Sequence, residues 1–147
     1  MEWRDGVGAG LHNLGNTCFM NATLQCLAHT PPLAKYMQHR LHSAKCKKNH
    51  RQTGNGFGTD FCAACRLENL VNKIFMHSAN AIAPRDFADR LPVFGRGFRL
   101  GRQEDAHEFL RGLLEQLTKT FNPAVCRTPR DKDTSSGKDT VVQRWFQ

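Results

Sequence analysis

With 147 residues, of which 39% are hydrophobic, the chain is long enough for about one domain with a modest core. It contains no apolar run near the roughly 18 residues needed to span a membrane, and its first residues lack the apolar segment of a secretory signal, so we expect a cytoplasmic or nuclear protein without membrane contact. The net charge of +8 permits nucleic-acid contact, but no aromatic residues interleave with the basic runs as base stacking requires, so nucleic-acid binding is not expected.

The first expected element is a glycine-containing turn that leads into a helix at about residues 18–30. Gly10 and Gly15 permit backbone angles that other residues avoid, and Asn16 and Thr17 are good capping residues. Cys18 then lies in the first turn of the helix. There the positive end of the helix dipole and the unpaired N–H groups favour the thiolate, which is the nucleophilic form.

Asn13 lies five residues before this cysteine and carries a neutral amide donor. If Cys18 attacked a carbonyl group, that amide could donate a hydrogen bond to the resulting oxyanion. The simpler interpretation is that Cys18 is a small buried residue, as most free cysteines are. The residue types alone do not decide between a nucleophilic and a buried Cys18.

A short second helix is expected at residues 32–37, opened by Pro32, and the segment that follows is rich in possible metal ligands. Cys62 and Cys65 form a C-x-x-C knuckle, which presents two thiolates to one tetrahedral ion, and His42 and Cys46 can complete a structural Cys₃His zinc site. His50 is the alternative to His42. A redox pair and unliganded cysteines also remain alternatives, although C-x-x-C redox motifs usually accompany a βαβ pattern, which is absent.

Three further helices are expected downstream. The first, at about residues 62–79, has a core-facing stripe made of Leu67, Leu70, Val71, Ile74 and Phe75. A short helix begins with Pro84 as its first residue and stops at Pro92. The longest runs over about residues 103–121, and its apolar stripe comprises Ala106, Phe109, Leu110, Leu113, Leu114 and Leu117. Its opposite side is expected to carry Asp105, Glu108, Gly112 and Glu115.

Acidic residues concentrate in the first two turns of this longest expected helix. Glu104, Asp105 and Glu108 lie there, where negative charge is stabilised by the helix dipole. That effect is a sufficient structural reason for their presence, without any binding role.

Two stretches closely resemble the ubiquitin-specific protease family. GLHNLGNTCFMN at residues 10–21, with LQCL at 24–27, is similar to its cysteine box, and QEDAHEFL at 103–110 is similar to its glutamine box. The resemblance implies that Cys18 is the nucleophile and that Asn13 helps to form the oxyanion hole. It further implies that Asp105, and after it Glu108, faces the arginine-rich C-terminal tail of ubiquitin, with Gln103 near the oxyanion side of the cleft.

The resemblance also implies a mostly α fold, namely the helical thumb subdomain of a papain-like cysteine protease with a short C-terminal strand. We expect residues 1–9 to be a lead-in and residues 10–126 to be the thumb-like part. Some family members carry a similar H-x-x-x-C…C-x-x-C insertion, which here would be a zinc-binding segment at residues 39–65. Residues 127–147 would be a loop and the incomplete start of the sheet region.

The activity implied is thiol-dependent hydrolysis of ubiquitin isopeptide bonds, with ubiquitin and ubiquitinated proteins as partners. Such an enzyme needs a base, usually a histidine oriented by Asp or Asn, and the family supplies both from downstream of the glutamine box. His107 occupies a variable position of that box and is not expected to be the base. We therefore expect a fragment, a truncated gene product or a degenerate copy, inactive alone; a non-catalytic ubiquitin-binding or adaptor module is the alternative.

Overall fold

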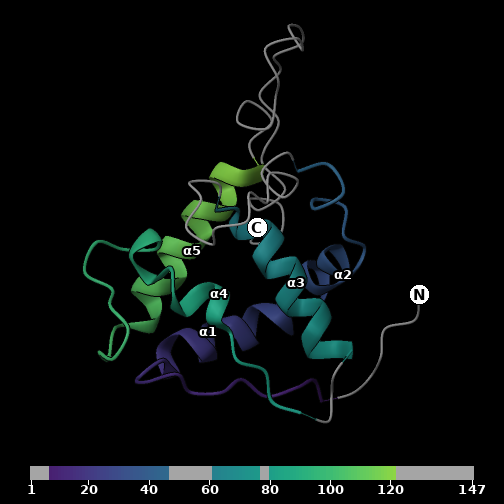
Figure 1. Ribbon diagram of the computed structural model, residues 1–147. Helices are drawn as coiled ribbons and strands as arrows, with labels where there is room; N and C mark the ends of the chain where they lie inside the picture. The colour runs from purple at the N-terminus through teal and green to yellow at the C-terminus, as the bar shows by residue number, and fades with distance from the viewer. Residues whose placement is uncertain (1–6, 47–60, 77–79, 122–147) are drawn as a thin grey trace, which may run out of the picture.

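A computed structural model describes residues 7–46, 61–76 and 80–121 of the chain (Figure 1). In these ranges the regular structure is helical, and the one extended pairing is an isolated parallel bridge between Leu11 and Ile82. The mostly α fold is therefore confirmed. The short C-terminal strand expected within residues 127–147 and the alternative ligand His50 lie outside the described residues. None of the described helices is long and apolar enough to cross a membrane.

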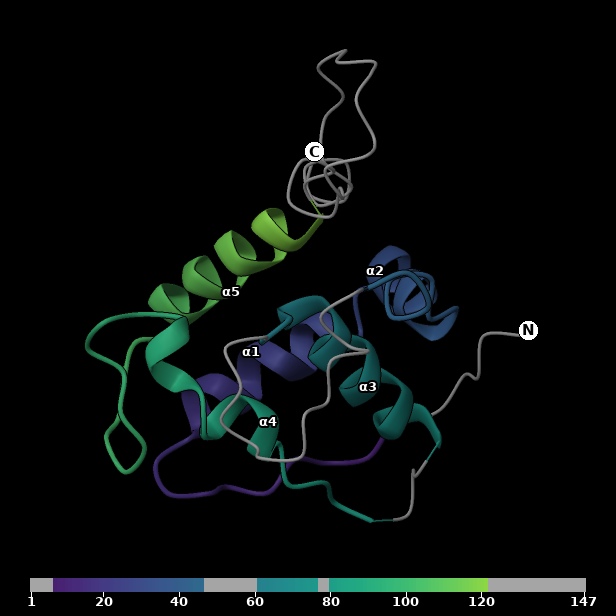
Figure 2. The ribbon, with the colours of Figure 1, turned by 45° about the horizontal axis from the view of Figure 1, so that its top comes forward.

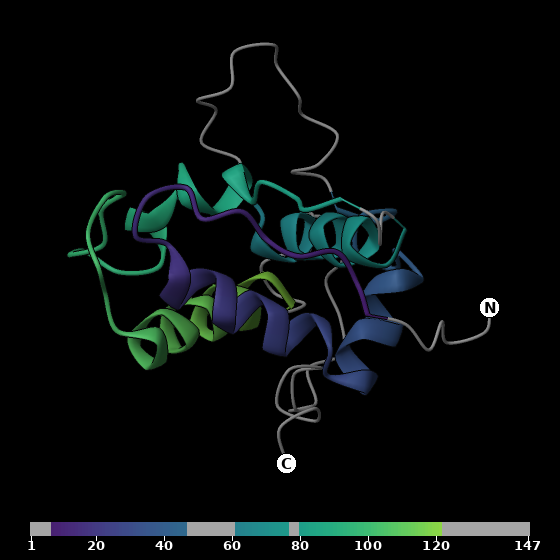
Figure 3. The same cartoon turned by 90° about the horizontal axis from the view of Figure 1, so that it is seen from below.

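Five α-helices and one 3₁₀ helix account for this structure. In chain order they are α1 (Cys18–Ala28), α2 (Pro31–Gln38), α3 (Ala63–Met76), α4 (Arg85–Ala88), η1 (Leu91–Val93) and α5 (Ala106–Phe121). Helix α1 packs against α2 and α5, and α3 packs against α2 and α5. Figure 3 shows α1 and α5 side by side, while α2 and α3 lie together on the other side of the molecule (Figure 2).

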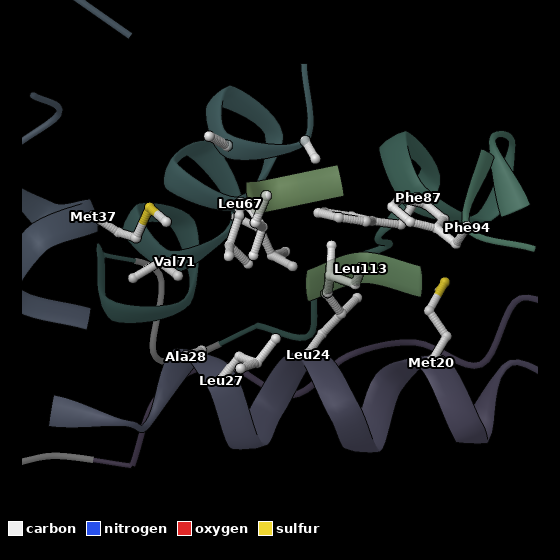
Figure 4. Close-up of a cluster of buried hydrophobic side chains, with 14 of the residues drawn as sticks. Met20, Leu24, Leu27, Ala28, Met37, Leu67, Val71, Phe87, Phe94 and Leu113 are labelled. Atoms are coloured by element: carbon white, nitrogen blue, oxygen red, sulfur yellow. The ribbon is translucent and has the colours of Figure 1, made fainter. Parts of the chain in front are cut away.

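The core forms where the apolar stripes of these helices face one another. Leu24 of α1, Leu67 of α3 and Leu113 of α5 are each fully buried and point toward the same interior, next to Phe87 of α4 (Figure 4). Burying a leucine or phenylalanine side chain of this kind contributes roughly 2 kcal/mol of transfer free energy. The helical spacing of apolar residues therefore placed most of the core correctly.

A chain of aromatic contacts connects the loop between η1 and α5 to the rest of the core. Phe98 stacks on Phe19 at a centroid distance of 5.9 Å, and both rings contact Phe109 of α5. Phe94 also packs edge-on against Phe109, at 5.2 Å. Because Phe94 and Phe98 are buried, the glycine-punctuated loop expected here is anchored at two points rather than free in solvent.

Two residues of α5 face opposite to the expectation. Gly112, expected on the polar side, is buried, and a Cβ atom added there would lie only 1.8 Å from the carbonyl oxygen of Phe94. Ala106, expected in the apolar stripe, is exposed. Gly112 lies on the packed face of α5, where the backbone of Phe94 approaches so closely that only a residue without a side chain fits.

The helix starts also differ from those expected. Helix α5 begins at Ala106 rather than at residue 103 because Asp105 caps it: the Glu108 N–H donates to Asp105 Oδ1 at 2.9 Å. Cys62 precedes the first residue of α3. Pro84 is the capping residue of α4 rather than its first residue, and Pro92 lies inside η1 instead of ending the structure. The α1 helix ends at Ala28, two residues earlier than expected.

Candidate functional site

The candidate nucleophile occupies the first position of α1. Cys18 is exposed, and its thiol donates to Gln103 Oε1 at a sulfur–oxygen distance of 3.8 Å. These two residues are 85 positions apart in the chain, one in each of the stretches singled out from the sequence. The fold therefore brings the two stretches together at an accessible sulfur atom, and Cys18 is not the small buried residue of the simpler interpretation.

The side chain of Asn13 is oriented by the loop that precedes α1. Its Oδ1 accepts hydrogen bonds from the N–H of Gly15 at 3.0 Å and from the N–H of Thr17 at 3.1 Å, and Thr17 Oγ1 donates to the same oxygen. Three donors at one atom identify that atom as the amide oxygen. The amide nitrogen Nδ2, which has no hydrogen-bond acceptor among the described residues, is then left as a donor for a ligand.

The loop that carries Cys18 is joined directly to the turn that carries Gln103. Asn16 Nδ2 donates to the carbonyl of Gly101 at 2.8 Å, and the Gly101 N–H donates to the carbonyl of Gly15 at 3.2 Å. All three residues have positive φ, namely 105° at Gly15, 53° at Asn16 and 89° at Gly101. Asn16 thus fixes the other loop instead of capping α1, and Thr17 is the capping residue without a side-chain cap bond.

A second set of hydrogen bonds holds the chain ahead of this loop. The Ile82 N–H donates to the Gly10 carbonyl at 2.8 Å, and the His12 N–H donates back to the Ile82 carbonyl at 2.9 Å. From α1, Asn21 Nδ2 donates to the His12 carbonyl at 3.0 Å, and Gln25 Nε2 donates to the Ala9 carbonyl at 2.9 Å. The sequence reasoning assigned no role to Asn21 or Gln25, because an amide on a helix does not reveal which backbone it will hold.

The acidic residues of the site lie at the start of α5. Asp105 and Glu108 are both exposed, and Asp105 is two residues after Gln103 in the chain. His107 is also exposed, as expected, and none of the histidines that the structure describes hydrogen-bonds to the Cys18 sulfur. Within the described residues Cys18 thus has an amide partner, Gln103, and no imidazole partner.

Four predicted metal ligands meet at a second, separate site. The ligand atoms of His42, Cys46, Cys62 and Cys65 all lie within 4.8 Å of one another, and all four residues are buried. His42 Nε2 is 3.1 Å from the sulfur of Cys62, and the sulfurs of Cys46 and Cys62 are 3.7 Å apart. Three sulfurs and one imidazole in a closed, buried cluster suit a structural tetrahedral zinc ion.

The electrostatics of this cluster favour one thiolate. A hydrogen bond from the Cys65 thiol, together with the imidazole of His42, lowers the pKa of Cys62 to about 4 in spite of its burial. The same hydrogen bond to Cys62, together with burial, raises the pKa of Cys65. The two thiols of the knuckle thus differ in acidity, and a divalent cation bound there would displace thiol protons.

Comparison with known proteins identifies the family of this chain. The family model for ubiquitin carboxyl-terminal hydrolase matches residues 9–147. Human ubiquitin carboxyl-terminal hydrolase 42 is 42% identical over 121 residues, which are 81% of this chain and 8% of that protein. Ubiquitin carboxyl-terminal hydrolase 23 of Arabidopsis thaliana is 40% identical over 118 residues, 80% of this chain and 13% of that protein. Human ubiquitin carboxyl-terminal hydrolase 17-like protein 6 is 40% identical over 140 residues, 95% of this chain and 30% of that protein.

A solved structure shares the fold. The SAGA DUB module of Ubp8, Sgf11, Sus1 and Sgf73 bound to monoubiquitin aligns with a TM-score of 0.62 and 29% identity, over 82% of this chain and 26% of that chain. This likeness confirms the expected helical region of a papain-like protease. The chain spans less than a third of the length of each relative named above. Because the family model covers nearly all of it, the chain belongs to the ubiquitin carboxyl-terminal hydrolase family of cysteine peptidases.

Proposed function

We propose that this chain is the nucleophile-bearing, thumb-like part of a cysteine-type deubiquitinase. The observation that carries the proposal is the exposed Cys18 thiol at the start of α1, in contact with Gln103 of the second family motif. The substrates would be ubiquitin and ubiquitinated proteins, and the relative with a solved structure is bound to monoubiquitin. Residues 39–65 would form the zinc-binding insertion within this thumb.

In the proposed reaction the Cys18 sulfur attacks the carbonyl carbon of the terminal glycine of ubiquitin. The C–N isopeptide bond breaks, the lysine amine leaves with a proton, and a thioester remains for water to hydrolyse. Asn13 is suited to the oxyanion because its Oδ1 is held by three donors while Nδ2 is not bonded to any described acceptor. A donor held rigidly in this way stabilises the transition state without reorganising at the moment of reaction.

The thiol proton must also be removed and returned to the leaving amine. No described histidine hydrogen-bonds to Cys18, and Gln103, which does, is not a base. We therefore expect Cys18 to be accessible to ubiquitin-directed reagents but the chain alone to be incapable of turnover. The alternative, a non-catalytic ubiquitin-binding or adaptor module, predicts binding without reaction at the sulfur.

For the 147-residue chain we predict covalent labelling by a ubiquitin probe with a thiol-reactive C-terminus, and no release of fluorophore from a ubiquitin C-terminal amide. Cys18→Ser should abolish the labelling. Cys26→Ser is the matched control because Cys26 is the other exposed cysteine of α1, and it should label as the unmodified chain does. Loss of labelling in Cys26→Ser would contradict the assignment of Cys18 as the nucleophile. Binding of ubiquitin without any labelling would also contradict it and would favour the adaptor module.

We further propose that Asp105, and after it Glu108, contacts the basic tail of ubiquitin. Asp105 also caps α5, so replacing it with alanine would remove a charge and a cap together. Asparagine is an equally good capping residue and removes the charge alone. This substitution therefore separates recognition from helix stability.

Asp105→Asn is predicted to lower the second-order rate constant of probe labelling about fivefold, as expected for an exposed ion pair worth about 1 kcal/mol. Its melting temperature should fall only slightly, because the cap is kept and only the charge–dipole interaction is lost, and its alkylation by iodoacetamide should not change, because the sulfur is intact. Glu115→Gln, which neutralises an exposed acid farther along the same helix, should leave labelling unchanged. Equal rates for Asp105→Asn and the unmodified chain would remove the assigned role.

We propose that His42, Cys46, Cys62 and Cys65 hold one structural zinc ion, which would tie the turn after α2 to the start of α3. The closed, buried Cys₃His set supports this assignment over a redox pair or unliganded thiols. None of the five cysteines in the described ranges forms a disulfide. This suits a reducing compartment, the cytoplasm or the nucleus.

Chain purified under reducing conditions should contain close to one zinc ion per molecule, measured by atomic emission. Removing it with a strong chelator should lower the melting temperature, because binding free energy at a structural site is folding free energy. Cys65→Ser should abolish both the zinc content and the effect of the chelator. A zinc content near zero in fresh, reduced samples would end the proposal.

A further inference from the structure

One buried carboxylate lies next to the metal ligands without being one of them. Glu68 of α3 is only 1% exposed, although charged side chains are rarely buried without partners. Its Oε1 accepts the N–H of His42 at 2.8 Å, and its Oε2 accepts the N–H of Ser43 at 2.9 Å. Both oxygens are thus used on the backbone of the segment that carries a proposed ligand.

The two N–H groups are ones that the segment cannot satisfy by itself. After α2 the chain turns at Arg40, which has a positive φ of 51°, and then makes a single turn in which Ala44 N–H donates to the Arg40 carbonyl. The first N–H groups of such a turn have no acceptor within it. Glu68 therefore caps this turn from another helix, and His42 lies at its start.

Helix α3 presents its polar groups at regular spacing. Cys62, Cys65 and Glu68 follow one another at intervals of three residues, so they lie on one side of the helix start. The side of α3 that supplies two sulfurs to the cluster thus also binds the backbone of the turn that carries the His42 imidazole. Four residues further on, Asn72 Nδ2 donates to the Met37 carbonyl at the end of α2 at 3.0 Å and to the Glu68 carbonyl of its own helix at 2.7 Å.

We propose that Glu68 is a positioning residue for the metal site: it fixes the His42 turn before the ion arrives, so that the ligands need little ordering on binding. The inference rests on the proposed zinc site but adds a residue outside its ligand set. Partners that orient metal ligands typically change affinity by 10- to 100-fold when they are mutated. Asn72, which binds the end of α2 and the Glu68 carbonyl but neither N–H group of the ligand turn, should have a much smaller effect.

The test compares Glu68→Gln with Asn72→Ala in the 147-residue chain, by competition for zinc with a chromophoric chelator. Glutamine keeps the size of the side chain but turns one acceptor into a donor that faces an N–H group. We expect Glu68→Gln to weaken zinc binding about 10- to 100-fold. Asn72→Ala should lower the melting temperature of the metal-free chain yet keep the zinc affinity within about threefold, or roughly 0.7 kcal/mol.

Cobalt substitution supplies a second readout that general destabilisation would not change. In cobalt-loaded Glu68→Gln the thiolate charge-transfer absorption should remain, because the sulfurs still bind, while the ligand-field bands should shift as the imidazole loses its fixed position. If Glu68→Gln does not fold, Glu68→Asp replaces it; its carboxylate is set back by one methylene and should weaken zinc binding in the same direction.

Three results would overturn the inference, and each shows whether the metal site or only the positioning role is wrong. If the unmodified chain binds neither zinc nor cobalt, the metal site itself is wrong. If that chain binds zinc and Glu68→Gln binds it equally tightly, the site stands and the positioning role is wrong. If Asn72→Ala weakens zinc binding as much as Glu68→Gln does, Glu68 acts only through general stability, and the positioning role is again wrong.

Discussion

The candidate active site depends on a pair of hydrogen bonds between two loops that are far apart in the chain. Asn16 donates to the Gly101 carbonyl and Gly101 donates to the Gly15 carbonyl, so the turn before α1 and the turn before α5 form one unit. Positive φ at all three positions gives the two turns the backbone conformation in which these hydrogen bonds form. Together with the packing of α1 against α5, this connection brings Cys18 and Gln103 to one site.

Much of the remaining structure holds these two turns in place. Phe98 and Phe94 anchor the loop that leads to Gly101, and Gly112 of α5 permits the close approach of the Phe94 backbone. The proposed zinc cluster closes the opposite part of the molecule, where α3 holds the α2 end through Asn72 and the ligand turn through Glu68. The two sites are linked through packing, because α3 contacts α5 and α5 contacts α1.

The sequence predicted what periodicity and ligand chemistry determine, and it missed what depends on tertiary approach. Apolar spacing located the helices and most of the core, and the C-x-x-C spacing found a cluster whose four members do meet. The close approach of Phe94 to Gly112 cannot be read from spacing, so that glycine was placed on the wrong side of α5. Glu68 was missed because a glutamate within a helix normally predicts solvent exposure, and its acceptor role depends on a segment about 25 residues earlier.

The most direct test of the account is the hydrogen-exchange rate of the Gly101 amide, measured by NMR on the isotope-labelled chain. If the two loops form one unit, this amide should exchange far more slowly than the neighbouring loop amides, and Asn16→Ala should speed its exchange without affecting the amides in the middle of α1. Exchange of Gly101 at the rate of an unprotected loop amide in the unmodified chain would show that the turn bearing Cys18 and the turn bearing Gln103 are not joined, and would contradict the account.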